Sequence, residues 1–257
     1  FWLALVPHFA FVQKSIIEGV LSFLAVPACL YGGLLLFRGR ESLFTLSRAV
    51  AVMGLLYLPL ESVVFLNRPL IETVTQHTAA LLTLLGYELE ITSIGGELPY
   101  QNTLTLAGAP GAPPRSTEVV LACTGLGSIT IFAGLVAAVR APLRRKLQAL
   151  AIVVPIIYVL NIIRVAFIAV AYGHQWFDLE PIVSPVLFLF GSTDPGMVSY
   201  FVADRILAQF LSVVALLALL WIVVRVLPEL FDVLEDVAYL ATGNEYDLRS
   251  MAESSAD

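Results

Sequence analysis

The sequence predicts an all-α polytopic membrane protein: a helical bundle of about five to six spans with a re-entrant or interfacial helix and a small outer β-hairpin. Hydrophobic residues make up 59% of the 257 residues and charged residues only 13%, whereas about 25% of residues are charged in globular domains. Several apolar runs reach the length of about 20 residues that crosses a bilayer. Basic residues gather between alternate runs, as they do in cytoplasmic loops. These observations favour one membrane-embedded domain, residues 1–257.

Five runs are apolar and long enough to be predicted as spanning helices. They cover residues 15–37, 43–66, 119–139, 147–172 and 197–226. Residues 1–12 are apolar but short, and we interpret them as the end of a further span.

Three basic clusters orient these helices. They comprise Arg38, Arg40 and Arg48, then Arg140, Arg144, Arg145 and Lys146, and finally Arg225. The positive-inside rule makes all three clusters cytoplasmic. The connections 67–115 and 173–196 are therefore expected on the outer side.

The first of these outer connections contains further predicted elements. Residues 68–87 begin polar and end apolar. Because a span here would reverse the alternation of sides, we expect a re-entrant or interfacial helix. Residues 88–92 and 103–106 alternate polar and apolar side chains about a Gly-Gly pair, which predicts a β-hairpin. A Gly/Pro-rich stretch completes the extracellular hairpin and loop, residues 88–117.

Residues 228–257 form an acidic tail that is predicted to be cytoplasmic. Its first part has Leu230, Val233, Leu234 and Val237 at helical spacing, which indicates a surface helix. Acidic residues outnumber basic ones by 20 to 14 in the whole chain, and the basic ones are nearly all arginine. This balance is typical of proteins from high-salt organisms.

Three polar residues inside apolar runs form the candidate site: Cys123, Arg164 and Arg205. A guanidinium in hydrocarbon costs about 2.5–3.5 kcal/mol on insertion scales, so it usually faces a cavity or a partner. Both arginines lie about 12 Å below the outer ends of their predicted spans at 1.5 Å per residue, and the cysteine lies about 6 Å deep. We therefore expect all three groups to meet in one pocket that opens outward.

Cys123 stands near a predicted helix N-terminus and is followed by Gly125 and Gly127. Backbone N–H groups at such a terminus stabilise a thiolate or an oxyanion, and a thiol near positive charge ionises more readily. The glycines would let a substrate backbone or another helix come close. The alternative is that Cys123 is a small packing residue, which is our interpretation of Cys29 in the middle of its span.

Asn161 is a supporting candidate because it lies one helical turn before Arg164, on the same face. It could hold the guanidinium or bind the substrate backbone. Arg164 could instead reach a lipid phosphate or pair with an acid such as Glu61. The carboxylate of Asp204, directly before Arg205, could pair with either arginine, so Arg205 could instead form a structural ion pair.

Other residues exclude several classes of function. All three histidines, His8, His77 and His174, lie outside the five predicted spans. Only His174, on the outer side, is kept as a candidate base for the Cys123 thiol. No His, Cys, Asp or Glu cluster has metal-ligand spacing, and the sequence has no phosphate loop and no serine nucleophile motif. No basic face supports nucleic-acid binding. We therefore expect no metal, no cofactor and no nucleic-acid partner.

Three short motifs resemble those of the exosortase/archaeosortase family of membrane transpeptidase-like enzymes. They are Ala122-Cys123-Thr124-Gly125, Asn161-Ile162-Ile163-Arg164 and Asp204-Arg205, and the resemblance extends over most of the chain. Bacterial exosortases typically have histidine at the third position, whereas the archaeosortase A branch has arginine, so Arg205 favours the archaeal branch. The resemblance implies that Cys123 is the nucleophile and that Arg164 stabilises the thiolate or oxyanion. It implies that Arg205 stabilises charge or positions the substrate.

In this family the substrates are surface proteins with a C-terminal tripartite signal: a short motif, a transmembrane helix and a basic tail. In the archaeosortase A branch the motif is Pro-Gly-Phe, and the resemblance implies surface glycoproteins as substrates. The resemblance implies a cysteine peptidase or transpeptidase of the cell membrane, with an extracellular active site, that cleaves this signal through a thioester at Cys123. A membrane lipid would then accept the protein. Two alternatives stay open: an intramembrane cysteine protease without lipid transfer, and a non-catalytic protein that binds anionic lipid through Arg164 and Arg205.

Overall fold

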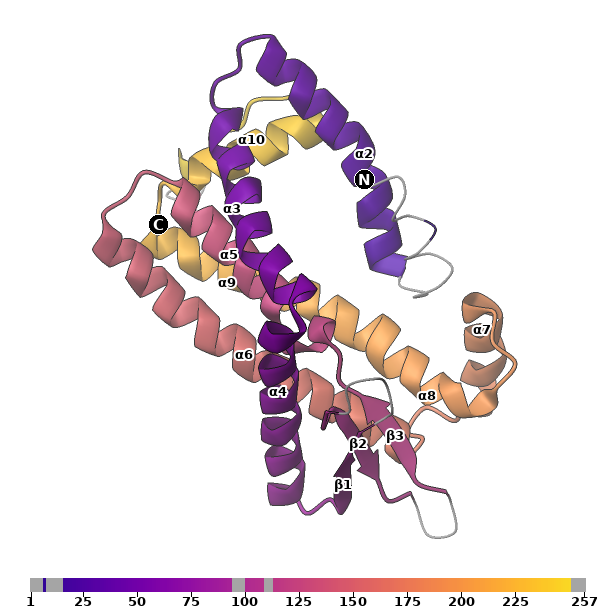
Figure 1. The fold of residues 1–257 in the computed structure, drawn as a ribbon. Helices are drawn as coiled ribbons and strands as arrows, with labels where there is room; N and C mark the ends of the chain where they lie inside the picture. Colours follow the sequence, from indigo (N-terminus) through magenta and orange to yellow (C-terminus); the bar gives the residue numbers. More distant parts are fainter. Residues whose placement is uncertain (1–6, 8–15, 94–99, 109–112, 251–257) are drawn as a thin grey trace. The chain divides into compact units, whose positions relative to one another are not determined.

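The structure is a computed structural model that describes residues 7, 16–93, 100–108 and 113–250 (Figure 1). Its elements are α2 (Ile16–Phe37), α3 (Leu43–Ser62), α4 (Val64–Leu84), β1 (Leu89–Thr92), β2 (Thr103–Leu106), β3 (Arg115–Glu118), η2 (Leu121–Thr124), α5 (Leu126–Ala138), α6 (Leu143–Gly173), α7 (Glu180–Phe190), η3 (Pro195–Met197), α8 (Val198–Tyr200), η4 (Phe201–Ala208), α9 (Gln209–Val226) and α10 (Leu230–Thr242). Of these, η2 and η3 are 3-10 helices and η4 is a π-helix.

The chain folds into two compact units. The first comprises Phe1–Leu56, Ile129–Val154 and Ala215–Asp257, and the second comprises Tyr57–Ser128 and Pro155–Val214. All the candidate site residues of the sequence belong to the second unit.

The helices confirm the predicted membrane fold. In the described part of the chain, four helical stretches are long and apolar enough to cross a membrane: Gly19–Phe37, Leu43–Ser62, Leu143–Gly173 and Pro195–Val226. Two shorter apolar helices, α5 and α7, accompany them. The apolar segment predicted at residues 1–12 lies almost entirely outside the described residues.

Two predicted spans differ in their boundaries. The run at 43–66 is interrupted after Ser62, because Val63 has an extended backbone (φ −103°, ψ 105°) and α4 begins directly after it. The run at 119–139 contains the 3-10 helix η2 and then the short helix α5, because Gly125 adopts a left-handed conformation (φ 75°) between them. The second change moves the candidate cysteine out of the helix.

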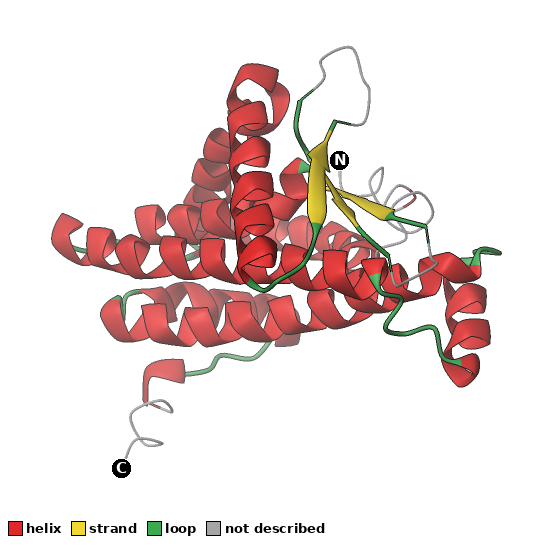
Figure 2. Cartoon of the chain, turned by 90° about the horizontal axis from the view of Figure 1, so that it is seen from below, coloured by secondary structure: helices red, strands yellow, loops and turns green. Residues whose placement is uncertain are grey.

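The second unit contains a three-stranded antiparallel sheet in the order β1-β2-β3, drawn in yellow in Figure 2. β1 and β2 form the predicted hairpin, in which Leu89 pairs with Leu106 and Thr92 with Thr103. β3 is an additional strand that pairs with β2 and places Arg115 opposite Leu106. The chain therefore leaves the sheet through β3, directly before the turn that carries the cysteine.

The core of the second unit joins this sheet to α4 and α6. Its buried apolar side chains come from all three elements and include Ile71, Val74 and Leu82 of α4, Leu104 and Leu106 of β2, and Val165 and Ala169 of α6. The end of α6 packs closely on β2, since a Cβ added at Gly173 would lie 3.1 Å from the Cβ of Leu106. Cys123 packs against the same core, to which α4, β2 and α6 all contribute.

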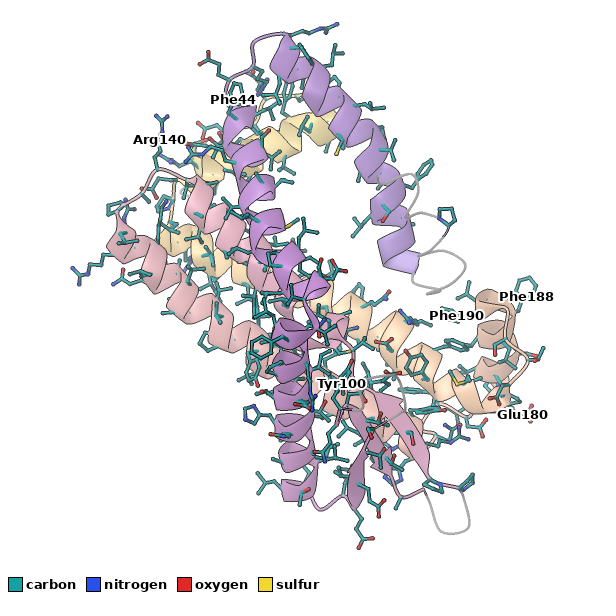
Figure 3. The ribbon with its side chains drawn as sticks, in the orientation of Figure 1. Phe44, Tyr100, Arg140, Glu180, Phe188 and Phe190 are labelled. Carbon is teal, nitrogen blue, oxygen red and sulfur yellow. The ribbon has the colours of Figure 1, made fainter. Side chains whose placement is uncertain are left out.

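Helix α7 was not predicted, because it falls in the connection expected to be an outer loop. It packs through Phe190, whose ring stacks on Phe201 with 4.7 Å between centroids, while Phe188 on the same helix is exposed (Figure 3). Since Phe201 is the first residue of η4, α7 supports the segment that carries Arg205.

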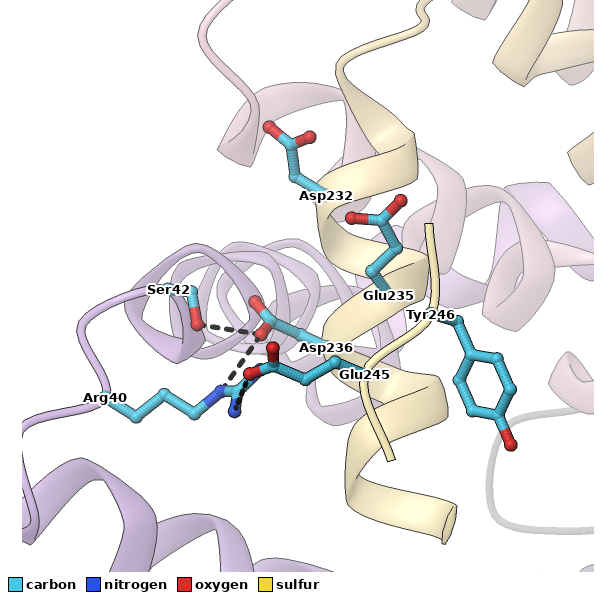
Figure 4. A pocket seen from close by; sticks show the side chains of 7 residues that line it. All are labelled: Arg40, Ser42, Asp232, Glu235, Asp236, Glu245 and Tyr246. Atoms are coloured by element: carbon cyan, nitrogen blue, oxygen red, sulfur yellow. Dashed lines mark hydrogen bonds and ion pairs between the residues drawn. The ribbon is translucent and has the colours of Figure 1, made fainter. Parts of the chain in front are cut away.

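In the first unit, the connection between α2 and α3 is tied to α10. Arg40 Nε lies 3.5 Å from Asp236 Oδ1, and Ser42 Oγ donates a hydrogen bond to the same oxygen at 2.7 Å. Arg40 and Asp236 line a pocket together with other acidic side chains (Figure 4). The helix predicted in the tail is thus confirmed as α10, although one of its carboxylates is buried in an ion pair.

Candidate functional site

Cys123 lies in the short turn η2, between the sheet and α5. After β3, Val119 N–H donates to the carbonyl of Asn102 at 2.7 Å, and Val120 is extended (φ −109°, ψ 170°). Cys123 N–H then donates to the Val120 carbonyl at 2.8 Å, which closes the turn. The cysteine is half-buried. It therefore precedes the helix, which corrects the predicted position inside the first turn of a span.

Thr124 holds the turn together from within. Its Oγ1 donates to the carbonyl of Leu121 at 2.7 Å and accepts from the N–H of Leu126 at 3.3 Å. One hydroxyl thus joins the start of η2 to the start of α5. Such hydrogen bonds from a threonine side chain to the nearby backbone compete with those of a regular helix.

Position 125 requires glycine, because of both its backbone conformation and its close neighbours. Its φ of 75° is left-handed, a region that side chains other than glycine rarely adopt. A Cβ added there would lie 3.2 Å from Ile157 Cγ2 and 3.3 Å from Asn161 Cβ. The glycines were expected to admit either a substrate backbone or another helix, and at Gly125 the close neighbour is a helix, α6.

Asn161 anchors the turn to α6. The residue is 7% exposed, and its side-chain amide donates a hydrogen bond to the carbonyl oxygen of Cys123. The expected roles were to hold Arg164 or to bind substrate, whereas the observed contact is with the backbone of the cysteine. Because Arg164 follows one turn later on the same face, α6 carries the partner of the cysteine and a candidate cation together.

Arg164 and Arg205 meet at the carboxylate of Asp204. Arg164 Nη2 lies 3.0 Å from Asp204 Oδ1, and Arg205 Nε lies 3.3 Å from Asp204 Oδ2. Asp204 is 8% exposed, and it takes the place of Glu61 as the partner of Arg164. Burial raises the pKa of the Cys123 thiol above its ordinary value, and the charge of Asp204 adds to this rise, whereas the charges of Arg164 and Arg205 lower the pKa. The fold thus brings the three predicted residues into one neighbourhood.

Asp204 and Arg205 lie in the π-helix η4. Such wider i→i+5 turns are rare and occur often at functional sites. The guanidinium of Arg205 also lies 5.9 Å from the ring centroid of Tyr200, the residue before η4. The segment is therefore held by α7, by Tyr200 and by the ion pair to α6.

The described histidines contact tyrosines. His77 Nδ1 lies 2.6 Å from Tyr158 Oη, and the ring centroid of His174 lies 5.5 Å from that of Tyr87. His8 lies outside the described residues. In the described part of the chain, no contact joins His77 or His174 to the Cys123 thiol, so a role of His174 as base gains no support. Among the same residues, no group of three or more His, Cys, Asp or Glu side chains could hold a metal ion.

Sequence reasoning treated Asp204 as a possible partner of either arginine and did not identify it as the partner of both at once. A signal was present, because Asp204 is the sole carboxylate in the apolar run 197–226, and a carboxylate inside a membrane segment is as costly as an arginine. The role of Thr124 had no comparable signal, since hydroxyl residues beside glycine are common in turns.

Comparison with known proteins identifies similar sequences. The family model described as transmembrane exosortase matches residues 1–202, a range that includes Cys123 and Arg164 and ends before Arg205. Archaeosortase A of Haloferax volcanii is 53% identical over 260 residues, covering 97% of this chain and 84% of that protein. Archaeosortase A of Natronomonas pharaonis is 47% identical over 243 residues, covering 92% of this chain and 75% of that protein. No solved structure matches the chain.

Proposed function

Because the chain belongs to the exosortase/archaeosortase family, we propose that it cleaves the C-terminal sorting signal of surface proteins with Cys123 as nucleophile and passes them to a membrane lipid. One observation carries this proposal. Asn161 holds the backbone of the cysteine. Burial raises the pKa of its thiol, and against this larger effect Arg164 and Arg205, which meet at Asp204, lower that pKa.

The first step is acyl transfer to the thiol. The Cys123 thiolate attacks the carbonyl carbon of a peptide bond near the signal motif, so that a C–S bond and an oxyanion form. Collapse of this intermediate breaks the C–N bond, and the amine of the released C-terminal segment takes up the proton that the thiol gave up. The surface protein is then held as a thioester on Cys123.

Arg164 and Arg205 supply positive charge where the oxyanion develops. Preorganised donors in a site with little water stabilise such charge strongly. Arg164 has a donor to offer, because its Nε is buried and has no hydrogen-bond partner among the described residues. Arginine stays protonated in proteins. We therefore assign both arginines to charge stabilisation and neither to the removal of the thiol proton.

The second step transfers the protein to a lipid. A lipid hydroxyl attacks the thioester, its oxygen forms a C–O bond as the C–S bond breaks, and the departing thiolate takes the hydroxyl proton. Water at the same step would give a free carboxylate, which is the reaction of a plain intramembrane protease. The signal is proposed to be of the Pro-Gly-Phe type, and the site is proposed to face the extracellular side.

The test is substrate processing in membranes. A surface protein that carries the tripartite signal is co-expressed with wild type, Cys123→Ala or Cys29→Ala, and its C-terminal fragment is followed by gel mobility. We expect Cys123→Ala to lose processing at normal membrane levels and Cys29→Ala, an exposed cysteine in the first unit, to keep it. Processing by Cys123→Ala would remove the nucleophile from the proposal. Mass spectrometry of the product then separates a lipid adduct from hydrolysis.

A further inference from the structure

The carboxylate of Asp204 uses both of its oxygens on arginines. Oδ1 accepts a hydrogen bond from Nη2 of Arg164 at 3.0 Å, a contact that joins α6 to η4 across 40 positions of sequence. Oδ2 lies 3.3 Å from Nε of Arg205, the next residue along the chain. The buried carboxylate of Asp204 therefore links Arg164, which is distant in sequence, to Arg205, which is adjacent.

The three side chains carry one net positive charge together, since arginine is always charged in proteins. Without Asp204, two largely buried guanidinium groups would stand together without a counter-ion, which is strongly unfavourable. With Asp204, the remaining positive charge equals the single negative charge of a thiolate or an oxyanion at Cys123. Burial raises the pKa of the Cys123 thiol, and beside this larger effect Asp204 raises it while Arg164 and Arg205 lower it, so the charges of all three groups act where the negative charge would form.

A buried donor on Arg164 supports the same arrangement. Its Nε has no hydrogen-bond partner in the described part of the chain, although buried polar atoms nearly always have one. A guanidinium presents five N–H donors in a planar fork, and Asp204 orients that fork by holding Nη2. An oriented fork with an unused buried donor fits an oxygen that arrives with the substrate.

We propose that Asp204 is a positioning residue for the reaction: it orients Arg164 and Arg205 about one anion-binding point and leaves them one net positive charge. This inference rests on the proposed function, because it assumes that negative charge develops at Cys123. Asp204 acts through the arginines, each of which contacts one of its oxygens, and the Tyr200 hydroxyl also donates a hydrogen bond to this carboxylate.

Steady-state kinetics of the full chain in lipid nanodiscs, with a signal-bearing peptide as substrate, tests the proposal. Asp204→Asn removes the charge and nearly keeps the shape. We expect kcat to fall by roughly 100-fold, the loss typical of a misplaced catalytic group, while KM changes by less than about twofold. A kcat equal to that of wild type would overturn the inference.

Asp236→Asn is the matched control. Asp236 is 4% exposed and pairs with Arg40 in the first unit, so the variant also removes a buried carboxylate from an arginine. We expect its kcat per folded enzyme to stay within about twofold of wild type. An equal loss of kcat in both variants would mean that Asp204 has only a structural role.

Comparison of a double variant with Arg164→Gln covers the case in which Asp204→Asn fails to accumulate. The variant Asp204→Asn/Arg164→Gln again carries one net positive charge and should reach normal membrane levels. Because Asp204 acts partly through Arg164, adding Asp204→Asn to Arg164→Gln should cost less than about tenfold in kcat. An undiminished 100-fold cost, on the order expected for an independent group, would contradict the proposal.

Cys123→Ala separates this inference from the proposed function. Processing by Cys123→Ala would defeat the proposed function itself. An inactive Cys123→Ala together with a fully active Asp204→Asn would defeat only the positioning role.

Discussion

The side-chain amide of Asn161 donates a hydrogen bond to the backbone carbonyl of Cys123. This contact joins a turn outside the long helices to α6. The same helix carries Arg164 one turn later, and that guanidinium meets Asp204. The position of α6 therefore sets where the thiol stands relative to the charged groups.

Replacing Asn161 with alanine should slow cleavage of the sorting signal by at least about tenfold. The carbonyl of Cys123 would lose its partner, and an unsatisfied buried acceptor costs about 1–3 kcal/mol, so the turn would shift. The rate of C-terminal fragment release in membranes measures the effect. Ile163→Ala, on the exposed face of α6 (51% exposed), should cleave at the wild-type rate. Equal rates for wild type and Asn161→Ala would contradict the anchoring role.

Gly125→Ala should destabilise the protein and reduce cleavage. The left-handed conformation costs about 1–2 kcal/mol for a residue with a Cβ, and the added methyl would press on Ile157 and Asn161 at 3.2 and 3.3 Å. Thermal unfolding in detergent and the rate of cleavage both report the change. Gly127→Ala is the control, because a Cβ there meets nothing within 4 Å. The assignment fails if the two alanine variants behave alike.

Thr124→Val should lower stability by about 1 kcal/mol, the usual contribution of a hydrogen bond, and should reduce cleavage. The isosteric valine cannot bond to Leu121 or Leu126, which the threonine hydroxyl joins. Thr124→Ser keeps the hydroxyl and should restore both properties. Unfolding temperature and fragment release are measured for both variants, and a serine variant as impaired as the valine variant would refute this role.

Arg164→Gln should lower kcat by roughly 10²–10³-fold, the loss found when one oxyanion donor is removed. Arg164→Lys keeps the charge and should recover part of the rate, but it lacks the planar fork. Peptide cleavage in nanodiscs gives both values. Arg68→Gln, which breaks an exposed i,i+4 pair with Glu72 in the same unit, should leave kcat unchanged. A fully active Arg164→Gln would exclude the arginine from catalysis.

Local sequence patterns predicted two strands of the sheet, β1 and β2, but not the third. Alternation at 88–92 and 103–106 predicted β1 and β2, because the two faces of a strand differ in burial. The strand Arg115–Glu118 has no such alternation, and it forms because it pairs with β2. Pairing between strands is a property of the fold, so the third strand could not be predicted from its own residues.

The elements around the cysteine show the same limit. Hydropathy predicted one continuous span at 119–139, yet the helix begins only after Gly125, whose conformation is coupled to its contact with α6. Helix α7 (Glu180–Phe190) is too short for a span and has a proline inside it. Its place is set by the stacking of Phe190 on Phe201, which no pattern within the helix indicates.

By itself, the sequence determined the membrane class, the long helices, the hairpin and the choice of Cys123, Arg164 and Arg205 as candidates. Hydropathy, alternation and the cost of a charge in an apolar segment are properties of each segment alone, so they can be read without a fold. Only the tertiary structure decided that Asn161 holds the cysteine and that Asp204 joins both arginines. The hydrogen bonds of Asn161 with Cys123 and of Arg164 with Asp204 join residues 38 and 40 positions apart, so the tertiary fold, which brings α6 to η2 and η4, determines which partners meet.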